Sequence, residues 1–180
     1  WSAWTRETPG PHVLAAHSMG GHIVTRALVD RVLSPAPAAA ILSAPMLGFL
    51  RGGVPVTLYR ATAKAMCALG DPKRQAWKLS EKPGEMPADR MKLLTHDPDR
   101  YEDEMVWRRQ RPELAMGPGS WGWVERALAS MAVIDAPGAL EAVTTPVLIV
   151  ATGNDKLVAI ADIDRAARRL PHGELVRFGN

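Results

Sequence analysis

The stretch that most constrains the fold is residues 13–22, VLAAHSMGGH, in which four apolar residues run into a serine and then a helical pattern. It predicts a buried strand, a sharp turn and a helix. At the top of such a turn Ser18 takes a strained, positive-φ conformation that pushes its hydroxyl out of the sheet. The crossing of strand and helix leaves little room, so small residues must stand two before and two after the serine. Ala16 and Gly20 meet this demand and Gly21 adds space, although alanine replaces the commoner glycine of the G-x-S-x-G motif.

The same turn places the backbone N–H of Met19 in the first turn of the predicted helix, residues 19–32. Amides at a helix N-terminus have no intrahelical partner and carry partial positive charge. An ester carbonyl attacked by Ser18 gains negative charge within reach of this donor, as in an oxyanion hole. The alternative is that Ser18 is an ordinary helix N-cap. The strand pattern before HSMGG favours the nucleophile.

A parallel sheet flanked by helices is the predicted architecture, which places the chain in the α/β class. Apolar runs at residues 13–16, 38–42, 145–151 and 175–178 predict strands, and helical patterns at 19–32 and 160–170 connect them. The run at 13–16 is too uniformly apolar for a half-exposed sheet edge. Residues 1–11 are polar and turn-rich, and they end in Pro-Gly-Pro, which breaks any helix before the first strand.

A long insertion separates two parts of this predicted core. Residues 1–45 and 143–180 carry the strands, whereas residues 46–142 alternate Gly/Pro-rich loops with short amphipathic helices and no convincing strand. Asp97 followed by Pro98 predicts a helix start within the insertion. We expect the insertion to be a lid over the serine, because long strand-free insertions are usually functional. A second helical layer of the core is the alternative.

Asp155 follows the third strand, at the edge of a parallel sheet where catalytic groups gather. Nucleophilic catalysis by serine needs a base for the hydroxyl proton and a carboxylate that orients the base. Asp155 suits the carboxylate, with a turn aspartate or helix cap as the alternative. Only His172 follows Asp155, but its turn before the last strand lies at the wrong end of the sheet. His17 and His22 flank the serine too closely in sequence to serve as its base.

Composition excludes several classes of function. The chain has 22 Lys+Arg against 19 Asp+Glu, a net charge of +3 with no basic run, which argues against nucleic acid binding and leaves weak attraction to anionic lipid surfaces open. The single Cys67 excludes an internal disulfide and favours a reducing, cytoplasmic location, with peripheral membrane contact open. We expect Cys67 to be a small buried hydrophobe. No metal-ligand cluster or phosphate loop appears, so we expect no cofactor.

Three segments together resemble one known family. They are AHSMGG at residues 16–21, LTHDP at 94–98 and PVLIVATGNDKLV at 146–158. They look like the serine hydrolases of the lysophospholipase L2 and monoacylglycerol lipase group. The resemblance implies an α/β-hydrolase fold, hydrolysis of carboxylic esters of lipids, Ser18 as nucleophile and Asp155 as acid. It also implies that the helical insertion is the family's cap.

Two parts of the family's site are not matched in this sequence. The resemblance implies a catalytic histidine after the last strand, which we expect beyond Asn180, and a second oxyanion donor from a loop after an earlier strand. We therefore expect a partial α/β-hydrolase fold, a fragment with negligible esterase activity of its own. Acyl transfer through the same acyl-enzyme and a non-catalytic binding module are the alternatives. Epoxide or haloalkane hydrolysis is disfavoured because it needs a carboxylate in place of Ser18. The sequence leaves the oligomeric state open.

Overall fold

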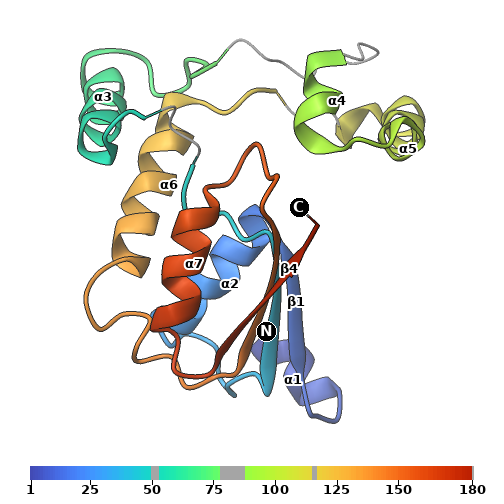
Figure 1. Cartoon of the computed structure of the whole chain (residues 1–180), viewed down its shortest axis with the longest axis vertical. Coiled ribbons are helices and arrows are strands. Elements are labelled where there is room, and N and C mark those ends of the chain that lie inside the picture. Colours follow the sequence, from blue (N-terminus) through green and yellow to red (C-terminus); the bar gives the residue numbers. More distant parts are fainter. Residues whose placement is uncertain (50–52, 78–87, 115–116, 180) are drawn as a thin grey trace. The chain divides into compact units, whose positions relative to one another are not determined.

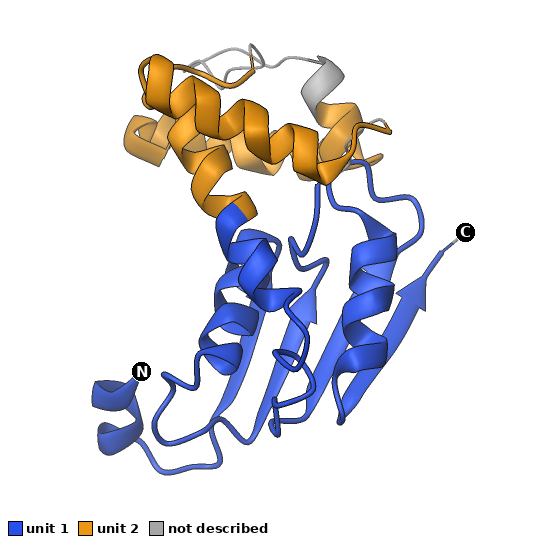
Figure 2. Ribbon diagram, turned by 90° about the vertical axis from the view of Figure 1, so that its left-hand side faces the viewer, with its two compact units in different colours: residues 1–50, 129–180 blue, residues 51–128 orange. Residues whose placement is uncertain are grey.

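The computed structural model describes residues 1–49, 53–77, 88–114 and 117–179, and the chain divides into two compact units (Figures 1 and 2). Unit 1 comprises Trp1–Leu50 and Ala129–Asn180, and unit 2 comprises Arg51–Leu128. Within the described ranges, every helix is too short or too polar to serve as a transmembrane span.

Unit 1 is built on a four-stranded parallel sheet, which confirms the predicted α/β class. Its strands are β1 (Val13–His17), β2 (Ala39–Ser43), β3 (Val147–Thr152) and β4 (Gly173–Phe178), in the order β1-β2-β3-β4. All three pairings are parallel, and Ser43 of β2 stands opposite both His17 of β1 and Val150 of β3. The carboxyl ends of β1, β2 and β3 therefore meet at one edge of the sheet.

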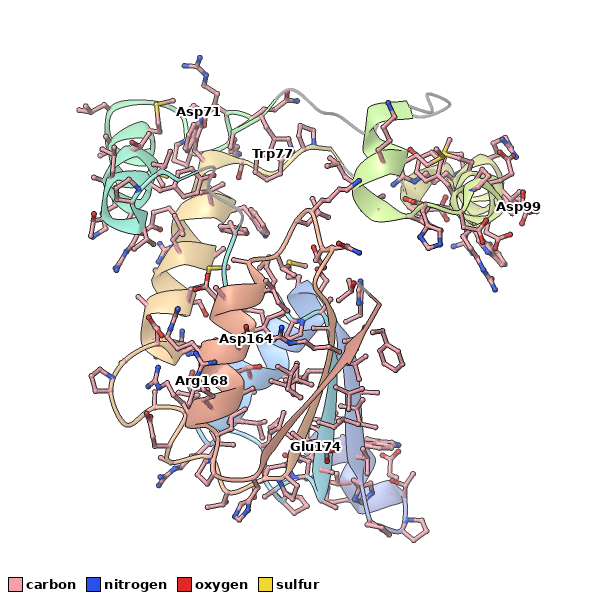
Figure 3. All side chains as sticks on the ribbon, viewed as in Figure 1. Asp71, Trp77, Asp99, Asp164, Arg168 and Glu174 are labelled. Atoms are coloured by element: carbon pink, nitrogen blue, oxygen red, sulfur yellow. The ribbon has the colours of Figure 1, made fainter. Side chains whose placement is uncertain are left out.

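Helices α2 (Met19–Val29) and α7 (Ile160–Arg169) lie along one face of this sheet (Figures 1 and 2). The fully buried Leu42, Ile149 and Ile163 form the centre of the core that these elements share. Asp164 of α7, labelled in Figure 3, pairs with Arg177 of β4 and ties the helix to the edge strand. A strand, a helix and the next parallel strand make the crossover that the sequence pattern predicts.

The other face of the sheet explains why the prediction of a uniformly buried first strand is wrong. β1 lies at an edge of the described sheet and alternates exposed with half-buried residues, and Val13 is 45% exposed. Ile41, on the same face as Ala15 and Leu148, is 40% exposed. Apolar composition alone does not distinguish burial on two faces from burial on one.

The first residues of the chain also differ from the prediction. Residues 2–7 form a short helix, α1 (Ser2–Glu7), instead of turns alone. The indole of Trp1 donates to the carbonyl of Pro35 at 2.6 Å, and the hydroxyl of Ser2 donates to the carbonyl of Ser34 at 2.9 Å. A six-residue helix is marginal by itself, and these contacts with a distant loop stabilise it.

Unit 2 is helical, and its described residues contain no strand beyond one isolated bridge, between Gln75 and Ser120. Its elements are α3 (Val56–Leu69), α4 (Ala88–Leu94), α5 (Pro98–Gln110), the 3-10 helix η1 (Pro112–Leu114) and the first part of α6 (Trp121–Ile134), which continues into unit 1. The side chain of Asp97 caps α5 and Pro98 is its first residue, as predicted. Cys67 on α3 is half-buried, so the prediction of a buried thiol is wrong.

Candidate active site

Ser18 occupies the turn between β1 and α2 with φ of 50° and ψ of −115°, which confirms the predicted positive-φ conformation. Its N–H donates to the carbonyl of Ser43 at 2.9 Å, and its carbonyl accepts from the N–H groups of Met46 at 3.0 Å and His22 at 3.1 Å. The Ser18 side chain makes no capping hydrogen bond to α2. Ser18 is thus the N-cap residue of α2 by position but does not cap the helix with its side chain, and its half-buried hydroxyl is left available for other partners.

The close contact beside this turn is at Gly21. A Cβ added there would stand 2.8 Å from the Cβ of Pro45, whereas a Cβ at Gly20 would meet the Cβ of Ala16 at an ordinary 3.7 Å. The methyl group of Ala16 therefore leaves room even for a Cβ at Gly20. The sequence predicts the tightest packing at the positions two residues before and two after Ser18. In the structure the tightest packing is between α2 and the segment after β2.

That segment is the part of the site that sequence reasoning missed. After β2 the chain turns at Ala44, which has φ of 42° and donates its N–H to the carbonyl of Val150 at 2.7 Å. Pro45 then packs on Gly21, and Met46 bonds to Ser18. The sequence does contain a signal for a turn here, the Ser-Ala-Pro run directly after a predicted strand. No pattern in the neighbouring residues indicates which other segment it packs against.

Met19 is the first residue of α2 and is 43% exposed. Its N–H precedes the first intrahelical hydrogen bond, so it has no partner within the helix. It belongs to the same peptide group as the carbonyl of Ser18, which two N–H groups hold on the opposite side. Because a peptide group is planar and trans, the N–H points away from those two donors.

Asp155 lies in the loop between β3 and α7, at the same sheet edge as Ser18. Its Oδ1 accepts from the N–H groups of Leu157 at 2.8 Å and Val158 at 2.9 Å. The loop is attached to the chain after β2 by the bond from Ala159 N–H to the carbonyl of Gly48 at 3.1 Å. Oδ1 of Asp155 thus stabilises the turn that follows it, and no described residue donates to Oδ2.

The histidines do not supply a partner for Ser18, since no described side chain is hydrogen-bonded to its hydroxyl. His172 precedes β4, and its carbonyl accepts from the N–H of Val147 at the start of β3. It lies at the amino ends of the strands, as predicted, opposite the edge that carries Ser18. His17 is exposed, with Nδ1 3.3 Å from the Ser43 hydroxyl.

His22 is buried on α2, and its ring nitrogens contact the Met46 carbonyl at 3.0 Å and the Ser130 hydroxyl at 2.8 Å. Burial lowers the pKa of His22 below its ordinary value, against the opposing effect of the Met46 carbonyl, and the nearby Arg26 guanidinium lowers it further. The imidazole is therefore neutral near pH 7. His22 thus contacts residues far from it in sequence.

The comparison with protein families identifies the family of this chain. The family described as Serine aminopeptidase, S33 (Hydrolase_4) matches residues 2–177, nearly the whole chain. The chain belongs to this family. A comparison with curated protein sequences gave no significant match.

Solved structures show that this member of the S33 family has the α/β-hydrolase fold. A monoacylglycerol lipase from Paleococcus ferrophilus superposes with a TM-score of 0.66 at 22% identity, over 98% of this chain and 62% of that one. A soluble variant of monoglyceride lipase from Saccharomyces cerevisiae gives a TM-score of 0.67 at 15% identity, over 98% and 55%. A carboxyl esterase from Bacillus coagulans gives 0.66 at 14% identity, over 98% and 59%. The chain thus spans somewhat more than half the length of these proteins.

Proposed function

We propose that this protein is a serine hydrolase that cleaves carboxylic esters of lipids through an acyl-enzyme on Ser18. The observation that carries the proposal is the conformation of Ser18, a non-glycine residue at φ of 50° whose side chain does not cap the helix that it begins. A backbone held in such a region costs about 1–3 kcal/mol and persists where the surrounding structure imposes it, often at active sites. Membership of the S33 family, whose description names a serine peptidase, supports Ser18 as the nucleophile.

In the proposed reaction the hydroxyl oxygen of Ser18 attacks the ester carbonyl while a base takes its proton. The carbonyl oxygen becomes an oxyanion, and the Met19 N–H donates to it. The base then protonates the leaving alcohol as its C–O bond breaks. Water next attacks the acyl-serine while the base takes a proton from the water, and the base gives that proton to the Ser18 oxygen as the carboxylic acid leaves. Oδ2 of Asp155 would accept the N–H of the base and orient it, while Oδ1 keeps the loop folded. We propose as base a histidine that follows Asn180, as the family resemblance implies.

A lipid ester is the substrate class that we propose, of the lysophospholipase or monoacylglycerol lipase type. Two of the structurally similar proteins are named as lipases of monoacylglycerols, and the AHSMGG and GNDKLV segments resemble that group. Unit 2 would act as the cap that selects the acyl chain. Its exposed apolar side chains, which include Leu58, Leu69 and Trp107, suit contact with lipid.

The first test is labelling by a fluorophosphonate, a reagent that phosphonylates activated serines, on the protein at its full natural length. We expect the Ser18 peptide to carry the label in mass spectra, and the Ser18→Ala variant to remain unlabelled. Asp155→Asn should lower kcat for a monoacylglycerol or lysophospholipid by roughly 10⁴-fold, as loss of the carboxylate does in serine proteases. A folded protein that takes no label would be a binding module instead.

The products separate the remaining alternatives. Free fatty acid released from a monoacylglycerol supports hydrolysis. Fatty acid transferred to an added alcohol in preference to water would show an acyltransferase that uses the same acyl-serine. Release of an amino-terminal amino acid from a peptide amide, with esters untouched, would refute the proposed substrate class.

A further inference from the structure

Met46, three residues beyond β2, is hydrogen-bonded through both of its backbone groups to the start of α2. Its N–H donates to the carbonyl of Ser18 at 3.0 Å, and its carbonyl lies 3.0 Å from Nδ1 of His22. The backbone N–H of His22 also donates to the carbonyl of Ser18, at 3.1 Å. Three residues from two segments therefore form a closed ring of hydrogen bonds around the Ser18 carbonyl, which we call the Ser18 ring.

The tautomer of His22 follows from the groups that its two ring nitrogens contact. Ser130 on α6 places its hydroxyl 2.8 Å from Nε2, and Nη1 of Arg26 donates to the same hydroxyl at 3.1 Å. A carbonyl oxygen only accepts, so the ring hydrogen of His22 is on Nδ1 and donates to the Met46 carbonyl. Nε2 of the neutral imidazole is then an acceptor, and the Ser130 hydroxyl donates to it while the Ser130 oxygen accepts from Arg26. Asp30 in turn accepts from Nε of Arg26 at 2.7 Å and fixes the guanidinium.

We propose that His22 is a positioning residue for the nucleophile and its oxyanion donor, an inference that rests on the function proposed above. The Nδ1–H of His22 holds the Met46 peptide, and Met46 holds the carbonyl of Ser18. That carbonyl and the Met19 N–H are the two ends of one planar peptide group, so fixing the first fixes the direction of the second. His22 touches neither substrate nor the reacting atoms, and acts only through this peptide.

The expected effect follows from the sensitivity of catalysis to donor placement. Removal of an oxyanion donor typically lowers kcat by roughly 10²–10³-fold, and a misplacement of about 1 Å can cost about 10²-fold. Loss of the His22 bond loosens the Met19 donor without removing it. A decrease in kcat of about 10–100-fold is therefore expected.

The test compares three variants of the protein at its full natural length. His22→Leu fills a similar volume but has no donor for Met46, whereas the side-chain amide of His22→Asn can place an N–H near the position of Nδ1. Thr25→Val is the matched control, because the buried Thr25 hydroxyl donates to the Gly21 carbonyl at 2.8 Å within the same helix and not to Met46. Each variant is measured for fluorophosphonate labelling rate, kcat, KM and the free energy of unfolding.

We expect His22→Leu to lower kcat and the labelling rate together, with KM changed less than about twofold, since the perturbed group acts on the transition state. His22→Asn should recover most of both rates, and Thr25→Val should lose stability without a change in either rate. Equal losses in the Leu variant and the Thr25 control, or an Asn variant as slow as the Leu variant, would show that His22 only stabilises the fold and would overturn the proposal.

A second measurement needs neither catalysis nor a folded variant. Nitrogen-15 NMR of the wild-type protein should show His22 neutral with its hydrogen on Nδ1, and a hydrogen on Nε2 would break the Ser18 ring and refute the inference while leaving the proposed function intact. A wild-type protein that is not labelled at Ser18 would refute the proposed function, and it would therefore also refute the proposed role of His22.

Discussion

Replacing Gly21 by alanine adds a methyl group where the structure leaves no room. The new Cβ would stand 2.8 Å from the Cβ and 3.1 Å from the Cα of Pro45, well inside the usual carbon separation of about 3.5–4.0 Å. Pro45 has little freedom to withdraw, because the N–H groups of Ala44 and Met46 on either side of it are bonded at 2.7 and 3.0 Å. Overpacking of this kind costs about 1–3 kcal/mol.

Gly20→Ala is the matched control for this variant. Both glycines lie in the first turn of α2, so the gain in helix propensity, up to about 1 kcal/mol, is similar for the two changes. A Cβ at Gly20 meets only the Ala16 methyl at 3.7 Å, an ordinary contact. The difference between the variants therefore isolates the contact with Pro45.

Urea denaturation of both variants measures that difference. We expect Gly21→Ala to be less stable than Gly20→Ala by about 1–3 kcal/mol. In a protein of about this size, each kcal/mol lowers the melting temperature by about 2–4 °C. Equal stabilities, or a more stable Gly21→Ala, would refute the argument that α2 and the segment after β2 are in contact at this point.

Three further predictions concern the same sheet edge. Ser18→Gly should be more stable than Ser18→Ala by about 1 kcal/mol. Glycine relieves a backbone strain of about 1–3 kcal/mol, but its larger loss of backbone entropy on folding costs about 0.5–1 kcal/mol. Thermal unfolding measures the difference, and an equally stable alanine variant would contradict the prediction. Gly48→Ala should lower the free energy of unfolding by at least about 1 kcal/mol, since its Cβ would lie 1.6 Å from Oδ2 of the buried Asp162. An unchanged midpoint of urea denaturation would contradict this prediction. The folded pKa of His22 lies below the ordinary 6.5, so the native state binds fewer protons and loses stability as the pH falls below about 6.5 towards that lowered pKa. Between pH 7.5 and 5.5 the free energy of unfolding should therefore decrease more in the wild type than in His22→Asn, and parallel decreases would contradict it.

The sequence alone determined the elements whose signals are local. The run from Val13 to Gly21 specifies a strand, a strained turn and a helix, because apolar residues, a serine and small residues follow one another at the required spacing. Asp97 followed by Pro98 specifies the start of α5 in the same way. The position of Asp155 after a parallel strand likewise follows from the order of apolar runs, whereas its catalytic role and that of Ser18 stay proposals.

Only the tertiary structure decided which residues surround the turn. Gly21 meets Pro45, and His22 bonds to Met46 and Ser130, which are 24 and 108 residues away in sequence. The exposure of β1 and Cys67 likewise depends on what other segments cover them. Periodicity and turn chemistry act over a few residues, whereas burial and long-range hydrogen bonds depend on how distant segments pack. For that reason the chain's own pattern indicates the turn at Ser18 but not the contacts that hold it.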